Sequence, residues 1–178
     1  MAGAASAATV FDLTGPGEIL GATESYSING TMLDVTSVGG EIHRNRNGLG
    51  VTTNPDRNRL GSNNSTMESL TFTFSRSLTL LGSIVFEHRG GMEMFEILDG
   101  DSNVLAVRRI MGDGNNSSTV ELDDLDLVGN TFTFRHLSGS GIRINQLTVT
   151  SVPLPAAMPM ALLAFGGLFV LGRRRKKV

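Results

Sequence analysis

The sequence predicts an all-β fold: a single β-sandwich, jelly-roll-like, followed by one C-terminal transmembrane helix. Three observations support this prediction. Apolar and polar residues alternate along most of the chain, Asn-Gly and Asp-Gly pairs separate the alternating stretches, and no sustained helical period occurs before Pro153. The length of 178 residues suits one domain with short appendages.

The predicted strands carry apolar residues at every second position, which buries one face of each strand. Asn29-Gly30 and the segment 99–103 are each flanked by two such stretches, so both predict β-hairpins. Separate strands are also expected around residues 9–13, 70–74, 78–80, 84–86, 120–122, 131–134 and 142–149. The expected core consists of Leu70, Phe72, Phe74, Phe86, Phe132, Phe134, Ile144 and Leu147.

Composition and charge exclude several classes of function. The chain has no cysteine, which excludes disulfide scaffolds, thiolate zinc sites and cysteine nucleophiles. Five of the fifteen basic residues form the block 173–177, so the rest of the chain carries 10 − 17 = −7 charges. An acidic body argues against nucleic acid as a partner, because binding phosphates requires a basic surface.

The C-terminal segment predicts a membrane span. Residues 155–172 contain no charged side chain and would form a helix about 27 Å long, enough to cross a bilayer core. The basic residues that follow predict a cytoplasmic C-terminus, with the body on the other side of the membrane. The alternative is a buried core helix. The basic block consists of Arg173, Arg174, Arg175, Lys176 and Lys177.

The order of motifs in this tail resembles a VPLPA-CTERM sorting signal, a variant of the PEP-CTERM signals of Gram-negative bacteria. Its motif is Val152, Pro153, Leu154, Pro155 and Ala156, and the apolar stretch and basic block follow it. The resemblance implies that an exosortase-type transpeptidase recognises the tail. The precursor would lie in the inner membrane with a periplasmic body, and processing would move the body to the cell envelope or outside. The alternative is a plain linker into a permanent anchor.

The N-terminal residues resemble the end of an export signal. Ala5-Ser6-Ala7 is a small-x-small pattern, which predicts cleavage after Ala7 or Ala8 and a true start upstream of Met1. The alternative is a flexible alanine-rich terminus. The expected organisation is therefore a remnant of the export signal over 1–8, a β-sandwich body over 9–151 and the sorting signal over 152–178.

Two groups of oxygen-bearing side chains are weak candidates for a structural Ca²⁺ site. Asp99, Asp101 and Asn103 stand at alternate positions, as in a calcium loop, but the twelfth loop position is Ile110 instead of Glu, and an ordinary hairpin turn is the simpler explanation. The second group is Asn63, Asn64 and Glu68. The histidines His43, His88 and His136 have no metal-binding spacing, and we expect no catalytic residues and no cofactor.

These observations predict an exported, non-enzymatic surface or matrix protein, which the resemblance ties to exopolysaccharide or biofilm. One alternative is a carbohydrate-binding module on a permanently anchored protein, and a second is a polysaccharide hydrolase. Sugar binding favours aromatic platforms, but the body has one tyrosine, no tryptophan and 9 − 2 = 7 phenylalanines. The alternating positions of those phenylalanines indicate core packing.

Overall fold

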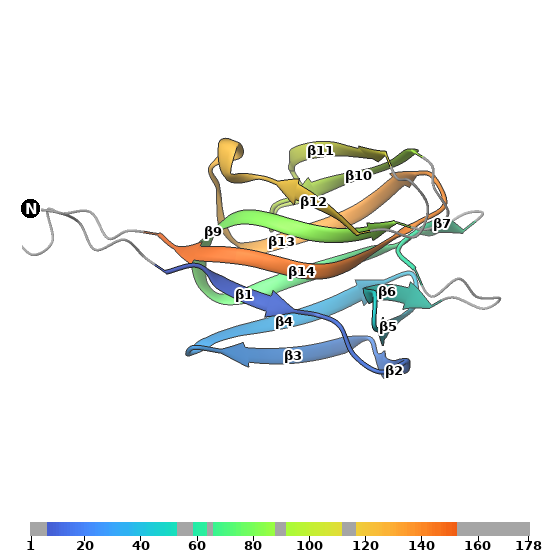
Figure 1. Cartoon of the computed structure of the whole chain (residues 1–178), viewed down its shortest axis with the longest axis horizontal. Helices are drawn as coiled ribbons and strands as arrows, with labels where there is room; N and C mark the ends of the chain where they lie inside the picture. Colours follow the sequence, from blue (N-terminus) through green and yellow to red (C-terminus); the bar gives the residue numbers. More distant parts are fainter. Residues whose placement is uncertain (1–6, 53–58, 64–65, 88–91, 112–116, 153–178) are drawn as a thin grey trace, which may run out of the picture.

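The structure is a computed structural model that describes residues 7–52, 59–63, 66–87, 92–111 and 117–152. These residues form antiparallel strands almost throughout, with one short 3₁₀ turn, η1 (Asp123–Leu125) (Figure 1). The all-β prediction is confirmed, and the arrangement is consistent with a β-sandwich. The predicted C-terminal helix lies outside the described residues. Among the helices of the described ranges, none has the length and apolar character to span a bilayer.

The strands succeed one another along the chain and are joined mostly by short connections. Their bounds are β1 (Thr9–Asp12), β2 (Glu18–Gly21), β3 (Thr23–Ile28), β4 (Thr31–Val38), β5 (Glu41–Asn45), β6 (Gly48–Thr52), β7 (Ser62–Asn63), β8 (Thr66–Met67), β9 (Ser69–Glu87), β10 (Met92–Leu98), β11 (Val104–Met111), β12 (Ser117–Glu121), β13 (Leu127–Ser138) and β14 (Ile142–Ser151).

The longest strand, β9, pairs with strands on both sides of the core. Its first part, residues 69–74, pairs with β4 and with residues 131–135 of β13. Its second part, residues 78–87, pairs with residues 127–129 of β13, with β14 and with β12. The ribbon of β9 curves back at the left of Figure 1, so one strand contributes to both sides of the core. The sheet order is β11-β10-β13-β9-β14-β6-β5-β2, with β3 added through β4 and β1 through β14.

The expectation of separate strands over 70–74, 78–80 and 84–86 was wrong in one respect. The structure joins these segments into one continuous strand of 19 residues. β9 bends between Thr73 and Leu78. Its pairing with β13 is interrupted there, because Thr131 of β13 pairs with Thr73 and Gly129 pairs with Leu78. No glycine or proline interrupts Ser75-Arg76-Ser77, so the chain turns the corner while its backbone stays extended.

The core is one cluster of apolar side chains from both sides of the fold. Phe72 and Phe134 pack edge to face with ring centroids 5.5 Å apart, and Phe11 of β1 packs on Phe74 at 5.6 Å. The predicted core positions Leu70, Phe72, Phe74, Phe132, Phe134, Ile144 and Leu147 are all buried. The side chain of Phe86 lies outside the described part of the structure.

Both predicted hairpins are confirmed. Asn29 and Gly30 connect β3 to β4 with φ angles of 51° and 73°, the left-handed conformations that a tight two-residue turn requires. Residues 99–103 connect β10 to β11, with Ser102 at a φ of 67°. The β10–β11 turn fixes the register that places Phe95 inside, and the β3–β4 turn fixes the register that places Leu33 and Val35 inside.

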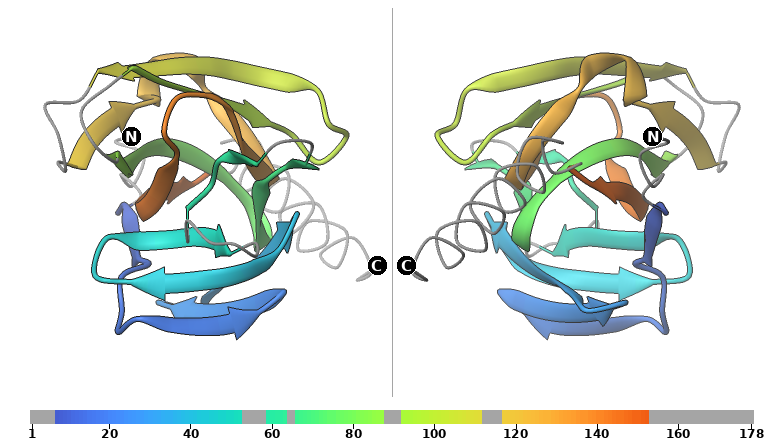
Figure 2. Two further views of the ribbon diagram at one scale, coloured as in Figure 1. Left: turned by 90° about the vertical axis from the view of Figure 1, so that its right-hand side faces the viewer. Right: turned by 90° about the vertical axis from the view of Figure 1, so that its left-hand side faces the viewer.

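The chain enters and leaves the body at one end, which we call the terminal end. β1 begins beside the end of β14, where Thr9 pairs with Val149, and both lie at the left of Figure 1. The β13–β14 turn lies at the opposite end, which we call the distal end. Figure 2 shows the fold along this axis, with β10 and β11 at the top and β3 and β4 at the bottom.

Candidate functional site

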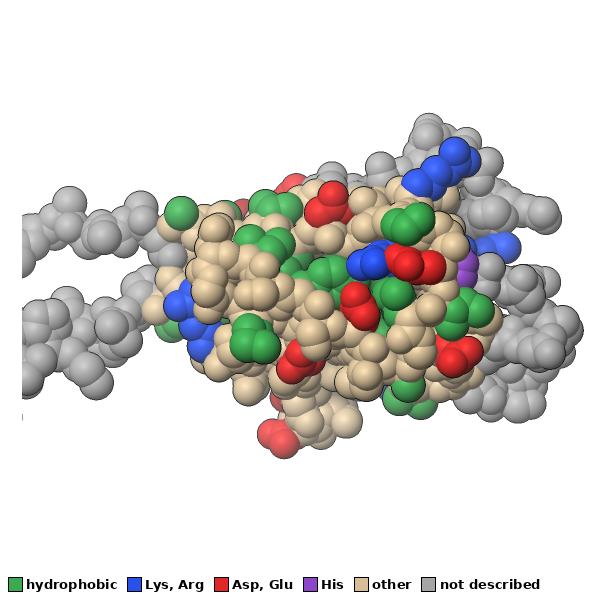
Figure 3. Space-filling model, turned by 90° about the horizontal axis from the view of Figure 1, so that it is seen from below, with side chains coloured by type: hydrophobic (Ala, Val, Ile, Leu, Met, Phe, Trp, Pro, Cys, Tyr) green, Lys and Arg blue, Asp and Glu red, His purple; other side chains and the backbone are tan. Residues whose placement is uncertain are grey.

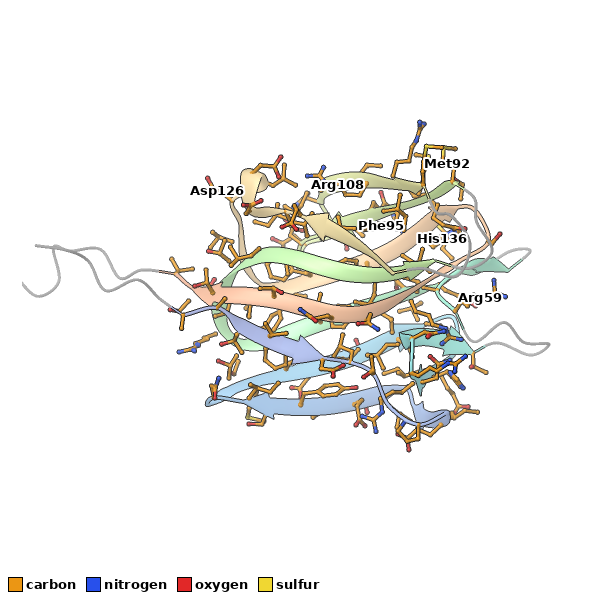
Figure 4. All side chains as sticks on the ribbon, viewed as in Figure 1. Arg59, Met92, Phe95, Arg108, Asp126 and His136 are labelled. Carbon is orange, nitrogen blue, oxygen red and sulfur yellow. The ribbon has the colours of Figure 1, made fainter. Side chains whose placement is uncertain are left out.

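The distal end holds a cluster of buried polar side chains that we call the distal polar cluster. It comprises Glu93 of β10, His136 of β13, Glu68 and the backbone of the turn Gly139–Gly141. Segment 59–61 lies against this turn. Figure 4 labels Met92, His136 and Arg59 at this end of the molecule, far from Asp126.

Glu93 is the centre of the cluster. Its carboxylate lies 3.0 Å from Nε2 of His136 and accepts hydrogen bonds from the backbone N–H groups of Ser140 (2.7 Å) and Gly141 (3.0 Å). The side chains of Glu93 and His136 are 1% and 0% exposed. A buried carboxylate without such donors would carry a large desolvation cost, so the three contacts explain why a charge is tolerated here.

The same contacts set the charge state of Glu93. Burial raises the pKa of Glu93, but the hydrogen bonds from His136, Gly141 and Ser140 outweigh burial and lower that pKa below its usual value. Nδ1 of His136 is buried and has no hydrogen-bond partner among the described residues. Nε2 is the ring nitrogen of His136 that faces the carboxylate, so Nε2 donates the hydrogen bond to Glu93.

A second layer of contacts holds segment 59–61 over the turn. Leu60 exchanges backbone hydrogen bonds of 2.8 and 2.9 Å with Ile142, and Nη1 of Arg59 donates to the carbonyl of Ser140 (2.8 Å). The N–H of Gly61 donates to Oε2 of Glu68 (2.8 Å). Together these bonds close the distal end of the core.

The two glycines of the turn leave little room for a side chain. Gly139 has a φ of 118°, and a Cβ at this position would lie 2.1 Å from Oε2 of Glu93. The cluster therefore holds the β13–β14 turn in place. Its carboxylate and imidazole are sealed from solvent, so the described geometry gives them a structural role.

The sequence leaves His136 as a strand or turn residue and does not identify Glu93 as its partner; the structure places His136 on β13. The sequence signal that could have identified this pair is the alternation of inward and outward residues along β10 and β13. Glu93 precedes the inward residues Phe95 and Ile97, and His136 follows the inward residue Phe134. Two polar residues at inward positions of neighbouring strands indicate a buried pair. His43 lies on β5, where Nδ1 is 3.4 Å from Nη1 of Arg143, and His88 lies outside the described residues.

The first candidate calcium group forms a hydrogen-bonded turn. Oδ1 of Asp99 accepts from the backbone N–H groups of Asp101 (2.9 Å) and Asn103 (2.8 Å), and Oδ2 accepts from Nδ2 of Asn103 (2.9 Å). The side-chain and backbone hydrogen bonds from Asn103 lower the pKa of Asp99; desolvation opposes them, and the bond from Asp101 adds to the lowering. These bonds are those of an Asx turn.

The second candidate group is only partly described. Glu68 is 3% exposed, and one of its oxygens accepts the Gly61 N–H. The side chain of Asn63 and all of Asn64 lie outside the described part of the chain. Within the described ranges, no three His, Asp or Glu side chains converge in a way that could hold a metal ion.

The sorting motif lies almost wholly beyond the described residues. Val152 is 37% exposed and follows the last residue of β14. The other motif residues (153–156) and the basic block (173–177) are not described. Ala7 and Ala8 are exposed and precede β1, so the predicted cleavage position is accessible in the described structure.

Charged side chains of both signs are mixed on the surface seen from below (Figure 3). One ionic group is defined by its contacts: Arg44 of β5 binds Glu18 of β2 at 2.5 Å and lies 3.6 Å from Glu24 of β3. All three side chains are half-buried. Comparison of the chain with protein-family models and with curated proteins found no match.

Proposed function

We propose that this chain is an exported surface or matrix protein whose C-terminal tail is a sorting signal for an exosortase-type transpeptidase. The observation that carries the proposal is the order of three elements in the tail: the motif at 152–156, an uncharged apolar stretch and five consecutive basic residues. The single C-terminal membrane helix and the jelly-roll-like character of the sandwich belong to the same proposal.

The arrangement of the body supports this proposal. β14 ends one residue before the motif, at the terminal end of the sandwich, and Val152 is exposed there. Proline has no backbone N–H and biases the preceding residue toward an extended conformation. Val152-Pro153-Leu154-Pro155 would therefore present an extended, unpaired backbone, which is what a protease requires.

The body would then project away from the membrane. The strands run from the terminal end to the distal end, so a chain anchored through residue 152 would hold the distal polar cluster far from the bilayer (Figure 1). In this proposal the sandwich is a rigid, non-catalytic unit, tied to exopolysaccharide or biofilm.

The test compares the wild type with the double variant Pro153→Ala, Pro155→Ala in a host that carries an exosortase. The variant should insert normally but stay full length in the membrane fraction, while the wild type appears as a shorter released form. Intact-mass measurement of that form locates the cut. A matched control is Pro16→Ala, which lies in the body and should be released like the wild type. If wild type and double variant are both full length and membrane-bound, the tail is only an anchor.

A further inference from the structure

The outer face of β3, β4, β9 and β13 carries two rows of hydroxyl side chains, which we call the hydroxyl face. In the first row, Thr23 pairs with Thr36, Thr36 with Thr71, and Thr71 with Thr133. The second row lies two residues along each strand and consists of Ser25, Asp34, Thr73 and Thr131. Seven of these eight positions are serine or threonine.

The register shows that these side chains point away from the core. The residues between them on the same strands, such as Val35, Phe72 and Phe132, are buried. Thr23, Ser25, Asp34 and Thr36 are exposed, and the four threonines of β9 and β13 are half-buried. Because neighbouring strands lie about 4.8 Å apart, the hydroxyls form a regular array.

This array is almost free of charge on a body that carries −7. Asp34 is its one charged residue, and it accepts a hydrogen bond from Oγ of Ser25 (2.6 Å). The next row toward the distal end contains the ion pair between Arg135 and Glu96, which marks the border of the neutral area. A polyanion would find no cation within these two rows, and a basic protein would find only the carboxylate of Asp34.

Some hydroxyls are satisfied by one another and others remain available. Oγ1 of Thr71 lies 2.8 Å from Oγ1 of Thr133, so these two stabilise the sheet. The hydroxyls of Thr36 and Thr73 bond to no other described residue, and they lie diagonally across β4 and β9. On one side, the tip of the β10–β11 hairpin borders the array, because a Cβ at Gly100 would lie 3.4 Å from Thr131.

We infer that the hydroxyl face binds an uncharged polysaccharide chain through repeated hydrogen bonds. A neutral polymer with hydroxyl groups at regular intervals matches a neutral array of donors and acceptors, and each hydroxyl can both donate and accept. Single contacts of this kind are weak, so affinity arises from many sugar units along the polymer. The inference rests on the proposed function in one respect: export is what would bring the body into contact with such polymers.

The test measures retention of the full chain, in detergent micelles, on amylose resin, cellulose and chitin particles, with a heparin resin as the polyanion. The wild type should be retained on at least one neutral polymer. Thr36→Val with Thr73→Val should weaken retention about tenfold, because it removes two hydrogen-bonding groups while keeping side-chain shape. The matched control is Thr79→Val with Thr148→Val, at half-buried positions of the second part of β9 and of β14.

Four outcomes would overturn the inference: no retention of the wild type on any neutral polymer, retention on heparin alone, equal retention of wild type and test variant, or an equal loss in the control variant. A fifth is a wild-type dimer, seen by sedimentation, that the test variant abolishes, since the face would then bind a second copy. Circular dichroism checks that both variants fold. These results do not depend on tail processing, so failure here and failure of the sorting proposal are separate.

Discussion

Glu93 should be among the most sensitive single positions in the body, because one buried carboxylate accepts three hydrogen bonds. Glu93→Ala would leave the His136 Nε2–H and the N–H groups of Ser140 and Gly141 without an acceptor. Each unsatisfied buried donor costs about 1–3 kcal/mol, so the buried donors of His136 and Gly141 together account for about 2–6 kcal/mol. We expect a loss of about 3–5 kcal/mol for the alanine variant and less for Glu93→Gln, which keeps one oxygen acceptor.

The loss should also depend on pH. Because hydrogen bonding lowers the pKa of Glu93 in the folded state, its contribution is fully present above the pKa of the unfolded chain, about 4.3. That contribution is lost as the pH falls through the lower folded-state pKa. The difference in unfolding free energy between the wild type and Glu93→Gln should therefore be largest near pH 7 and shrink at strongly acidic pH.

Urea unfolding of the full chain, followed by far-UV circular dichroism between pH 7 and pH 2, gives this difference directly. The control is Glu41→Gln, at an exposed position of β5, which should change stability by less than about 0.5 kcal/mol. A difference for Glu93→Gln that stays constant over the whole range would show that the carboxylate charge does not hold the turn, and would refute the reasoning.

Three further predictions test the core, the distal turn and the tail. Phe72→Ala should lower the unfolding free energy by about 3–5 kcal/mol, because the ring is buried; a loss below about 1 kcal/mol would contradict that packing. Gly139→Ala should cost about 2–4 kcal/mol, because its φ is 118° and a Cβ would overlap Glu93, whereas Gly17→Ala, with nothing within 4 Å, should be nearly neutral. A reporter fused after Val178 should be active only in the cytoplasm; periplasmic activity would refute the predicted topology.

The fold class and the core could be predicted because alternation carries direct structural information. Leu70, Phe72 and Phe74 had to share one face of a strand, and Asn29-Gly30 fixed the adjacent hairpin. Local patterns contain no signal for a strand that bends without a turn residue, so the continuity of β9 was missed. Whether a strand continues around such a corner depends on the tertiary pairing of β13 and β14 with its two parts.

The distal polar cluster shows a different limit of sequence reasoning. Glu93 and His136 are 43 residues apart, and the turn that supplies the other donors is a further four to five residues along the chain. Spacing rules for sites look for short separations, and these residues have none. Their contact arises because β10 and β13 are sheet neighbours, which places Phe95 opposite His136 and Glu93 close to the β13–β14 turn.

The hydroxyl face could not be predicted from the sequence for the same reason. Along each strand its residues are ordinary polar partners of buried neighbours. Only the register of four strands brings Thr23, Thr36, Thr71 and Thr133 into one row. Threonine also has a high β-propensity, which alone would account for single positions. Propensity does not account for the neutrality of two adjacent rows on a body of charge −7, and it is this neutrality that the polymer-binding experiment tests.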